Sequence, residues 1–145
     1  GYNSILDNIA AAVLSVKLKH ISGVISRRRN IAGMYHEQLD CIDELILPFP
    51  PTIAGKYYDS FQNYVIRADA TDRDKLQEHL SKNGVETLVH WRTPNHKQKG
   101  LSSLNKYDLP VTEAISERCL SLPMYPELTN DQVNHVAKTV RSFFG

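Results

Sequence analysis

The stretch FQNYVIRADATDRDKLQEHLSKNGVETLVHW, residues 61–91, decides the fold class of this chain. Phe61–Arg67 is aromatic and β-branched, which predicts a strand. A pattern that resembles a capping box, Thr71–Asp74, opens a helix, and the glycine C-cap signal Asn83-Gly84 ends it. Val85–Trp91 predicts a second strand. The order strand, helix, strand indicates a mixed α and β domain.

Two helices are predicted upstream of that stretch. The first follows a capping pattern at Ser4 and Asp7 and is apolar on nearly every side up to Leu18. A surface helix has one apolar stripe, so we expect a surface outside this chain to cover part of this one. A break at Ser22-Gly23 precedes the second helix, whose apolar face continues to residue 42. The three arginines Arg27–Arg29 point to different sides of this helix and form no single patch. We expect most of them to lie on a solvated face; the alternative is that one of them binds phosphate.

Three shorter signals follow residue 91. Thr112–Arg118 predicts a short helix, and Leu120–Pro123 a short strand. The capping box Thr129–Gln132 opens a last amphipathic helix. The predicted class is therefore α/β (α+β), with two long N-terminal helices followed by a small sheet of about three strands covered by helices.

Composition excludes several function classes. The 145 residues carry 17 Lys+Arg and 16 Asp+Glu, a net charge of +1, which gives no general attraction to nucleic acid or anionic membranes. The longest apolar stretch, Ile9–Val16, is too short to span a bilayer. Cys41 and Cys119 form no disulfide framework; we expect both to be reduced, in the cytoplasm, and to serve as small core residues.

No motif for covalent or metal chemistry is present. The six histidines lack metal-ligand spacing, and neither cysteine has a C-x-x-C partner. The nucleophile-elbow, P-loop and dinucleotide-binding motifs do not occur. The sequence therefore predicts no metal site and no catalytic residue within this chain.

The densest cluster of functional side chains is HWRTPNHKQ, residues 90–98, which follows a predicted strand. Such loops often display binding residues. The indole of Trp91 suits stacking on a ring, Arg92 suits pairing with phosphate, and His90 and His96 add polar contacts. The alternative is a solvated loop in which Trp91 plugs the core.

Several segments together resemble the C-terminal region of the DegT/DnrJ/EryC1/StrS aminotransferases. The matching residues are Gly1-Tyr2-Asn3-Ser4, Leu6-Asp7, Ala11–Leu14, Lys17-Leu18, Arg27–Arg29 with Ala32 and Tyr35, His90-Trp91 with Pro94, His96 and Gln98, Leu109-Pro110 with Thr112-Glu113, and Leu120–Pro126 with Leu128-Thr129. They span nearly the whole chain in order.

The resemblance implies the small domain of a fold-type-I aminotransferase, a pyridoxal-phosphate enzyme that acts on nucleotide-linked keto sugars. The family's Schiff-base lysine lies in a large N-terminal domain, which we expect to be absent from these 145 residues. The chain alone is then expected to be inactive. Residues 1–46 are expected to form interdomain and homodimer helices, and residues 57–145 the small α/β domain.

The resemblance also implies binding residues. Asn3 matches the G-x-N asparagine that, in the family, reaches the cofactor phosphate of the neighbouring subunit, although Ile5 replaces the usual arginine. The 90–98 loop is expected to border the nucleotide-sugar pocket, with His96 and then Trp91 as the foremost contacts. Two alternatives remain open: a non-catalytic binding or regulatory module derived from the same fold, and a ferredoxin-like small-molecule or RNA-binding domain.

Overall fold

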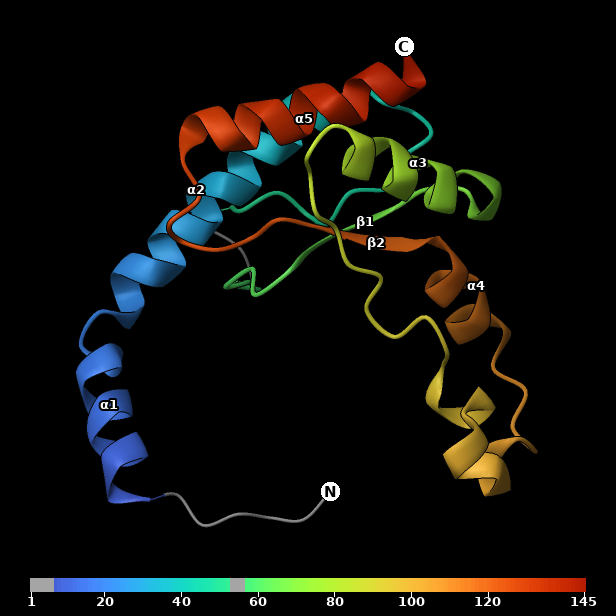
Figure 1. Ribbon diagram of the computed structural model, residues 1–145, viewed down its shortest axis with the longest axis horizontal. Coiled ribbons are helices and arrows are strands. Elements are labelled where there is room, and N and C mark those ends of the chain that lie inside the picture. Colours follow the sequence, from blue (N-terminus) through green and yellow to red (C-terminus); the bar gives the residue numbers. More distant parts are fainter. Residues whose placement is uncertain (1–6, 53–56) are drawn as a thin grey trace.

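A computed structural model describes residues 7–52 and 57–145 (Figure 1). Helix α1, Asn8–Leu18, begins at Asp7, whose Oδ1 accepts a 2.7 Å hydrogen bond from the amide of Ala10. The Ser4 half of the expected capping pattern lies outside the described residues. Helix α2 spans Ile21–Leu39. The two long N-terminal helices are thus confirmed.

The break between α1 and α2 lies earlier than predicted. The amides of Gly23 and Val24 both donate to the carbonyl of His20, so Ser22-Gly23 forms the first turn of α2. The chain bends by 61° between the helices. Among the described residues, no single helix is long and apolar enough to cross a membrane; α1 and α2 reach that length and composition only as a bent pair.

The sheet has two strands rather than about three. Strand β1, Tyr64–Arg67, pairs antiparallel with β2, Cys119–Leu122. Each outer edge carries one isolated antiparallel bridge, Ile46 to Arg67 on one side and Leu88 to Ser121 on the other. The predicted strand over 85–91 is therefore reduced to a single bridge.

Two local features explain why that third strand does not extend. Leu88 and Ser121 exchange both backbone hydrogen bonds, so the next bonded pair would join Glu86 to Pro123. Pro123 has no amide hydrogen, and its carbonyl accepts a 3.0 Å hydrogen bond from the hydroxyl of Tyr35. On the other side, Trp91 has a φ of +59°, which turns the chain away from the sheet.

Three further helices complete the body. Helix α3 spans Ala70–Lys82 and is followed by Gly84, whose φ of +75° belongs to the expected glycine C-cap. The capping box predicted at Thr71–Asp74 is wrong, because Thr71 lies inside the helix and the N-cap is Asp69, which makes no side-chain cap hydrogen bond. Helix α4, Pro110–Arg118, starts two residues earlier than predicted, with proline in its first turn. Helix α5, Asn130–Phe144, has the predicted capping box between Thr129 and Gln132.

The core lies between the sheet and helices α2, α3 and α5, and α5 packs against both α2 and α3 (Figure 1). Successive side chains of a strand point to opposite faces of the sheet, and one face supplies buried side chains to this core. Its largest fully buried members are Ile31, Tyr35, Leu39, Phe61, Tyr64, Ile66, Leu76, Leu80, Leu120, Val133 and Val140. Helix α1 contributes no buried residue.

The arginine triplet of α2 is not a freely solvated face, because all three guanidinium groups contact protein acceptors. Arg27 donates to the Leu128 carbonyl and to Asn130 Oδ1, the latter at 2.9 Å. Arg28 reaches the carbonyls of Phe61 and Gln62, at 3.3 and 2.9 Å. Arg29 reaches those of Thr52 and Asp59, at 2.7 and 2.6 Å. Each guanidinium thus ties α2 to main chain that is distant in sequence.

Candidate functional site

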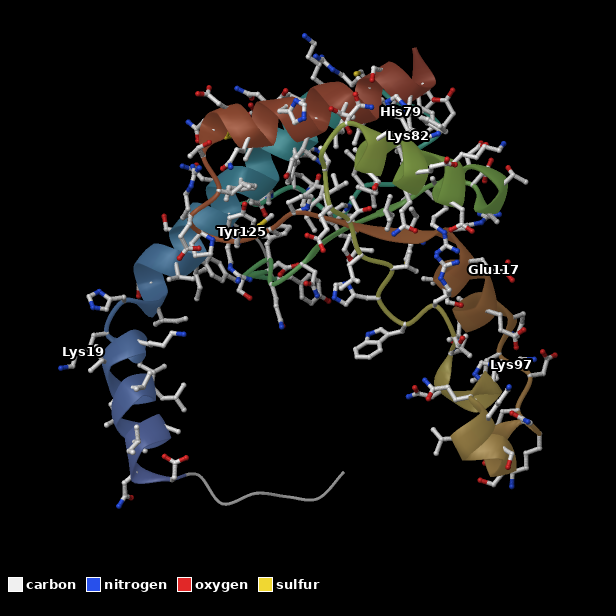
Figure 2. All side chains as sticks on the ribbon, in the orientation of Figure 1. Lys19, His79, Lys82, Lys97, Glu117 and Tyr125 are labelled. Carbon is white, nitrogen blue, oxygen red and sulfur yellow. The ribbon has the colours of Figure 1, made fainter. Side chains whose placement is uncertain are left out.

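The four predicted substrate contacts, His90, Trp91, Arg92 and His96, all lie where the chain leaves the sheet edge beyond β2. From there two short 3-10 helices, Asn95–Lys97 (η1) and Lys99–Leu104 (η2), lead back to α4. This segment and α1 lie at opposite ends of the body, with Lys97 on the former and Lys19 at the break after the latter (Figure 2). The structure thus brings the four residues into one region but gives each different surroundings.

Trp91 does not plug the core. Its side chain is 77% exposed, and its backbone adopts the left-handed region at φ +59°. For a bulky residue this conformation costs on the order of 1–3 kcal/mol and persists only where the surrounding structure fixes it. The alternative in which the indole is a core residue is therefore wrong, and the ring is available to a partner or ligand.

His90 is half-buried and is held by the sheet. Its Nδ1 lies 2.7 Å from the Oγ of Ser121 on β2, and its ring centroid lies 6.3 Å from that of Trp91. Arg92, also a predicted substrate contact, makes longer hydrogen bonds than His90. Its guanidinium lies 3.3 Å from Asp74 Oδ1 and 3.4 Å from Gln77 Oε1, both on α3. Because both partners are exposed, the Arg92 ion pair contributes little to stability and leaves the guanidinium able to exchange partners.

His96 is buried, with 3% of its surface exposed. Its Nε2 lies 2.9 Å from Glu113 Oε1 on α4, and the Nζ of Lys97 lies 3.2 Å from the same oxygen. Hydrogen bonds from His96 and then Lys97 hold the pKa of the Glu113 carboxyl below its ordinary value. The ring that the sequence favoured as a ligand contact therefore also anchors η1 to α4.

Two hollows meet at His90. One, of about 740 Å³, is mostly apolar and is lined by Trp91, Pro94, Leu104, Tyr107, Leu109 and Ile115, with both histidines on its wall. The other, of about 640 Å³, lies between residues 84–88 and the start of α5 and includes Ser121 and Tyr125. Both volumes fall in the range of small-molecule sites, and apolar walls with few polar groups are typical of such sites.

None of the described lysines lies in an enclosed position. All of them are exposed, whereas a lysine that carries pyridoxal phosphate needs an enclosed position beside the cofactor. Asn3, the predicted phosphate contact, lies outside the described residues. Within the described part of the chain, no group of three metal-ligating side chains comes together.

Two residues of this region were not singled out as site residues from the sequence. Ser121 is buried on β2 and contacts His90, and Glu113 contacts His96. The pattern Leu120-Ser121-Leu122, with one polar residue between two apolar ones in a strand, was the available signal for Ser121. Of the two cysteines, Cys41 is exposed rather than in the core, and Cys119 is intermediate; both are free.

Comparison with known proteins identifies relatives of the whole chain. A "Pleiotropic regulatory protein" of Geobacillus stearothermophilus is 37% identical over 99% of this chain and 38% of its own length. The UDP-N-acetyl-3-dehydro-alpha-D-glucosamine 3-aminotransferase of Acidithiobacillus ferrooxidans is 35% identical over 97% of this chain and 37% of its own length. The chain therefore spans less than two fifths of these relatives.

Solved structures agree with this match. The structure of S. venezuelae DesV in complex with a ketimine intermediate superposes with a TM-score of 0.88 and 30% identity, over 99% of this chain and 38% of that one. The family model described as the DegT/DnrJ/EryC1/StrS aminotransferase family matches residues 1–141. The chain belongs to the DegT/DnrJ/EryC1/StrS aminotransferase family.

Proposed function

We propose that this chain is the C-terminal part of a pyridoxal-phosphate-dependent aminotransferase that transfers an amino group, from glutamate, to a nucleotide-linked keto sugar. The observation that carries the proposal is that the chain matches, along its whole length, little more than a third of relatives named as sugar-nucleotide aminotransferases. One is a dTDP-3-amino-3,6-dideoxy-alpha-D-galactopyranose transaminase of Aneurinibacillus thermoaerophilus, 32% identical over 99% of this chain. The products would feed surface polysaccharide or related glycans, in the cytoplasm.

Within that enzyme, α1 packs against the N-terminal cofactor domain and the homodimer partner. The support is the state of α1 here. Its large apolar side chains are exposed, from 48% at Leu14 to 79% at Ile9, and no residue of the helix is buried. Contiguous exposed apolar surface of this kind marks an interaction site. Within residues 1–46, α1 thus supplies the interdomain contacts, whereas the buried face of α2, with Ile31, Tyr35 and Leu39, belongs to the core of the small α/β domain of residues 57–145.

The substrate lies against the 90–98 loop. Trp91 offers an exposed aromatic face, Arg92 an exposed guanidinium, and His90 and His96 polar ring atoms on the wall of the 740 Å³ hollow. An aromatic ring and a cation close together suit a sugar or base linked to a diphosphate. Asn3 contacts the cofactor phosphate of the neighbouring subunit.

The chain alone carries no transaminase activity and binds no pyridoxal phosphate. The amino transfer needs a lysine in covalent contact with the cofactor. The exposed lysines of the described residues offer no enclosed position for it.

The experiment compares this chain with the full-length gene product that contains it. Both are incubated with pyridoxal phosphate, and the absorbance of lysine-bound cofactor is measured before and after borohydride reduction. A borohydride-sensitive band in the longer protein alone, with amino transfer from glutamate to a nucleotide keto sugar, is the expected result. No band in either protein would contradict the enzyme assignment.

A second function has one observation in its favour. Two relatives carry names that refer to regulation, the Geobacillus protein and the "Erythromycin biosynthesis sensory transduction protein EryC1" of Saccharopolyspora erythraea, 35% identical over 98% of this chain. A non-catalytic binding or regulatory module would bind a sugar nucleotide without cofactor or turnover. The same absorbance measurement separates the two functions.

A further inference from the structure

The contact between His90 and Ser121 determines which nitrogen of the His90 ring is free to bind a ligand. His90 stands on the wall of both hollows, and its Nδ1 is 2.7 Å from Ser121 Oγ. No hydrogen bond from the other ring nitrogen, Nε2, to a described residue is present. Nε2 is therefore the nitrogen left for a ligand.

Ser121 is well placed to hold a ring. Its backbone amide and carbonyl both bond to Leu88, at 2.8 and 3.2 Å, and only 5% of the residue is exposed. Its neighbours Leu120 and Leu122 face the core, so the Ser121 side chain leaves the opposite face of the sheet, towards His90. The hydroxyl oxygen is thereby fixed by strand geometry.

The proton of that hydroxyl decides which tautomer His90 adopts. Among the described residues, the ring of His90 is the one hydrogen-bond partner of Ser121 Oγ. If Nδ1 carried the proton, it would donate to Oγ, and the hydroxyl hydrogen would have no acceptor among the described residues. Leaving a buried polar group unpaired is unfavourable. If the hydroxyl donates to Nδ1 instead, both groups are satisfied and the ring proton lies on Nε2.

We propose that Ser121 is a positioning residue that holds His90 in the tautomer protonated at Nε2, so that the ring presents a hydrogen-bond donor to an oxygen of the substrate in the adjoining hollow. The oxygen belongs to a diphosphate or to a sugar hydroxyl or carbonyl, all of which accept. This step rests on the proposed function, which places the substrate against the 90–98 loop. A neutral ring that donates through one nitrogen and accepts through the other binds such an oxygen without a buried charge.

The first measurement concerns the ring alone and needs no cofactor or substrate. Side-chain ¹⁵N spectra of the labelled chain report the protonation of each ring nitrogen, and the loss of one set of signals in His90→Gln assigns them. The expected result is a proton on Nε2 and an Nδ1 shifted as an acceptor of a hydrogen bond. In Ser121→Ala the Nδ1 signal should move to the position of an unbonded ring nitrogen, and Ser121→Thr, which keeps a hydroxyl, should restore it.

Ser116→Ala is the matched control. Ser116 lies on the wall of the 740 Å³ hollow, and its hydroxyl donates to the Glu113 carbonyl, 2.9 Å away, instead of a histidine. Its loss should leave the His90 signals in place. A proton on Nδ1 in the unsubstituted chain, or an Nδ1 signal that Ser121→Ala does not move while backbone amide spectra keep the native pattern, would overturn the proposal.

The second measurement uses the full-length enzyme. Ser121→Ala should raise KM for the nucleotide sugar about tenfold and leave kcat within about twofold, because the ring binds the substrate and does not react with it. An unchanged KM beside the expected ring signals would show that His90 does not contact the substrate, which overturns the binding half of the inference. An unsubstituted full-length protein without transaminase activity would contradict the proposed function instead, and the ring signals would still test Ser121.

Discussion

Two buried tyrosines, Tyr35 on α2 and Tyr64 on β1, are predicted to respond in opposite directions to the same substitution. Their rings are packed together, with centroids 5.1 Å apart, and they are 0% and 1% exposed. The hydroxyl of Tyr35 donates to the Pro123 carbonyl at 3.0 Å. The hydroxyl of Tyr64 has no hydrogen-bond partner among the described residues. Replacing either residue with phenylalanine removes one oxygen from the same packed layer.

The magnitudes follow from those partners. Tyr35→Phe loses a hydrogen bond worth about 0.5–1.5 kcal/mol net and leaves the Pro123 carbonyl unpaired, so we expect a total loss of about 1–3 kcal/mol. Tyr64→Phe removes a buried hydroxyl that costs about 1–3 kcal/mol to leave unpaired, so the stability should stay the same or rise by about 1 kcal/mol. The small void left by the oxygen is common to both variants and cancels in their comparison.

Urea unfolding followed by circular dichroism measures this difference, because the midpoint gives stability directly when the slope is unchanged. The Tyr35→Phe midpoint should fall below that of the unsubstituted chain, and the Tyr64→Phe midpoint should equal or exceed it. Equal losses in the two variants would refute the argument from hydrogen-bond partners. A loss above about 1 kcal/mol in Tyr64→Phe would mean that its hydroxyl does have a partner, such as a bound water.

Three further outcomes are expected. Thr129→Ala should cost about 1 kcal/mol in urea unfolding, because it removes the capping box of α5. Glu113→Gln should speed amide hydrogen exchange across η1 without changing global stability, because it weakens the hydrogen bond that holds His96. In the unsubstituted chain the same contact should weaken only as the pH falls through the lowered pKa of Glu113, below 4.5. Burial raises the pKa of Tyr35 and Tyr64, so the free energy of unfolding, measured with urea, should fall as the pH rises above about 10, where the unfolded chain ionises, by about 1.4 kcal/mol per pH unit for each tyrosine. Either phenylalanine variant should halve that slope.

Two helix boundaries that depend on near neighbours were predicted well, whereas the capping box expected at Thr71–Asp74 does not form, because α3 already begins at Ala70. The capping box at Thr129 and Gln132 and the glycine at position 84 act within one helical turn, and both are where the sequence predicted them. The third strand failed for the opposite reason. Val85–Trp91 has strand composition, but its pairing depends on Pro123, more than thirty residues away, which offers no amide hydrogen.

In the predicted site, too, features that depend on residue type were predictable, and features that depend on contacts between distant residues were not. A loop rich in histidine, tryptophan and arginine was identifiable from residue types, and Trp91 is indeed exposed within it. The burial of His96 was not identifiable, because it depends on Glu113, which approaches only once α4 has folded beside η1. The arginines of α2 are similar: their acceptors are main-chain carbonyls, such as that of Gln62, which carry no signal in the sequence.

Helix α1 is where sequence and structure support one another most directly. Its composition predicts burial on several sides, and none of its described residues is buried. An isolated helix of 11 residues is marginal in water, and most helical stability in proteins comes from packing of an apolar face. Among the described residues α1 finds no such packing, since Ile9, Val13 and Leu18 are exposed, which supports the proposal that a surface outside this chain covers the helix. This argument rests on α1 alone, and the match to about 38% of the length of longer aminotransferases supports it independently.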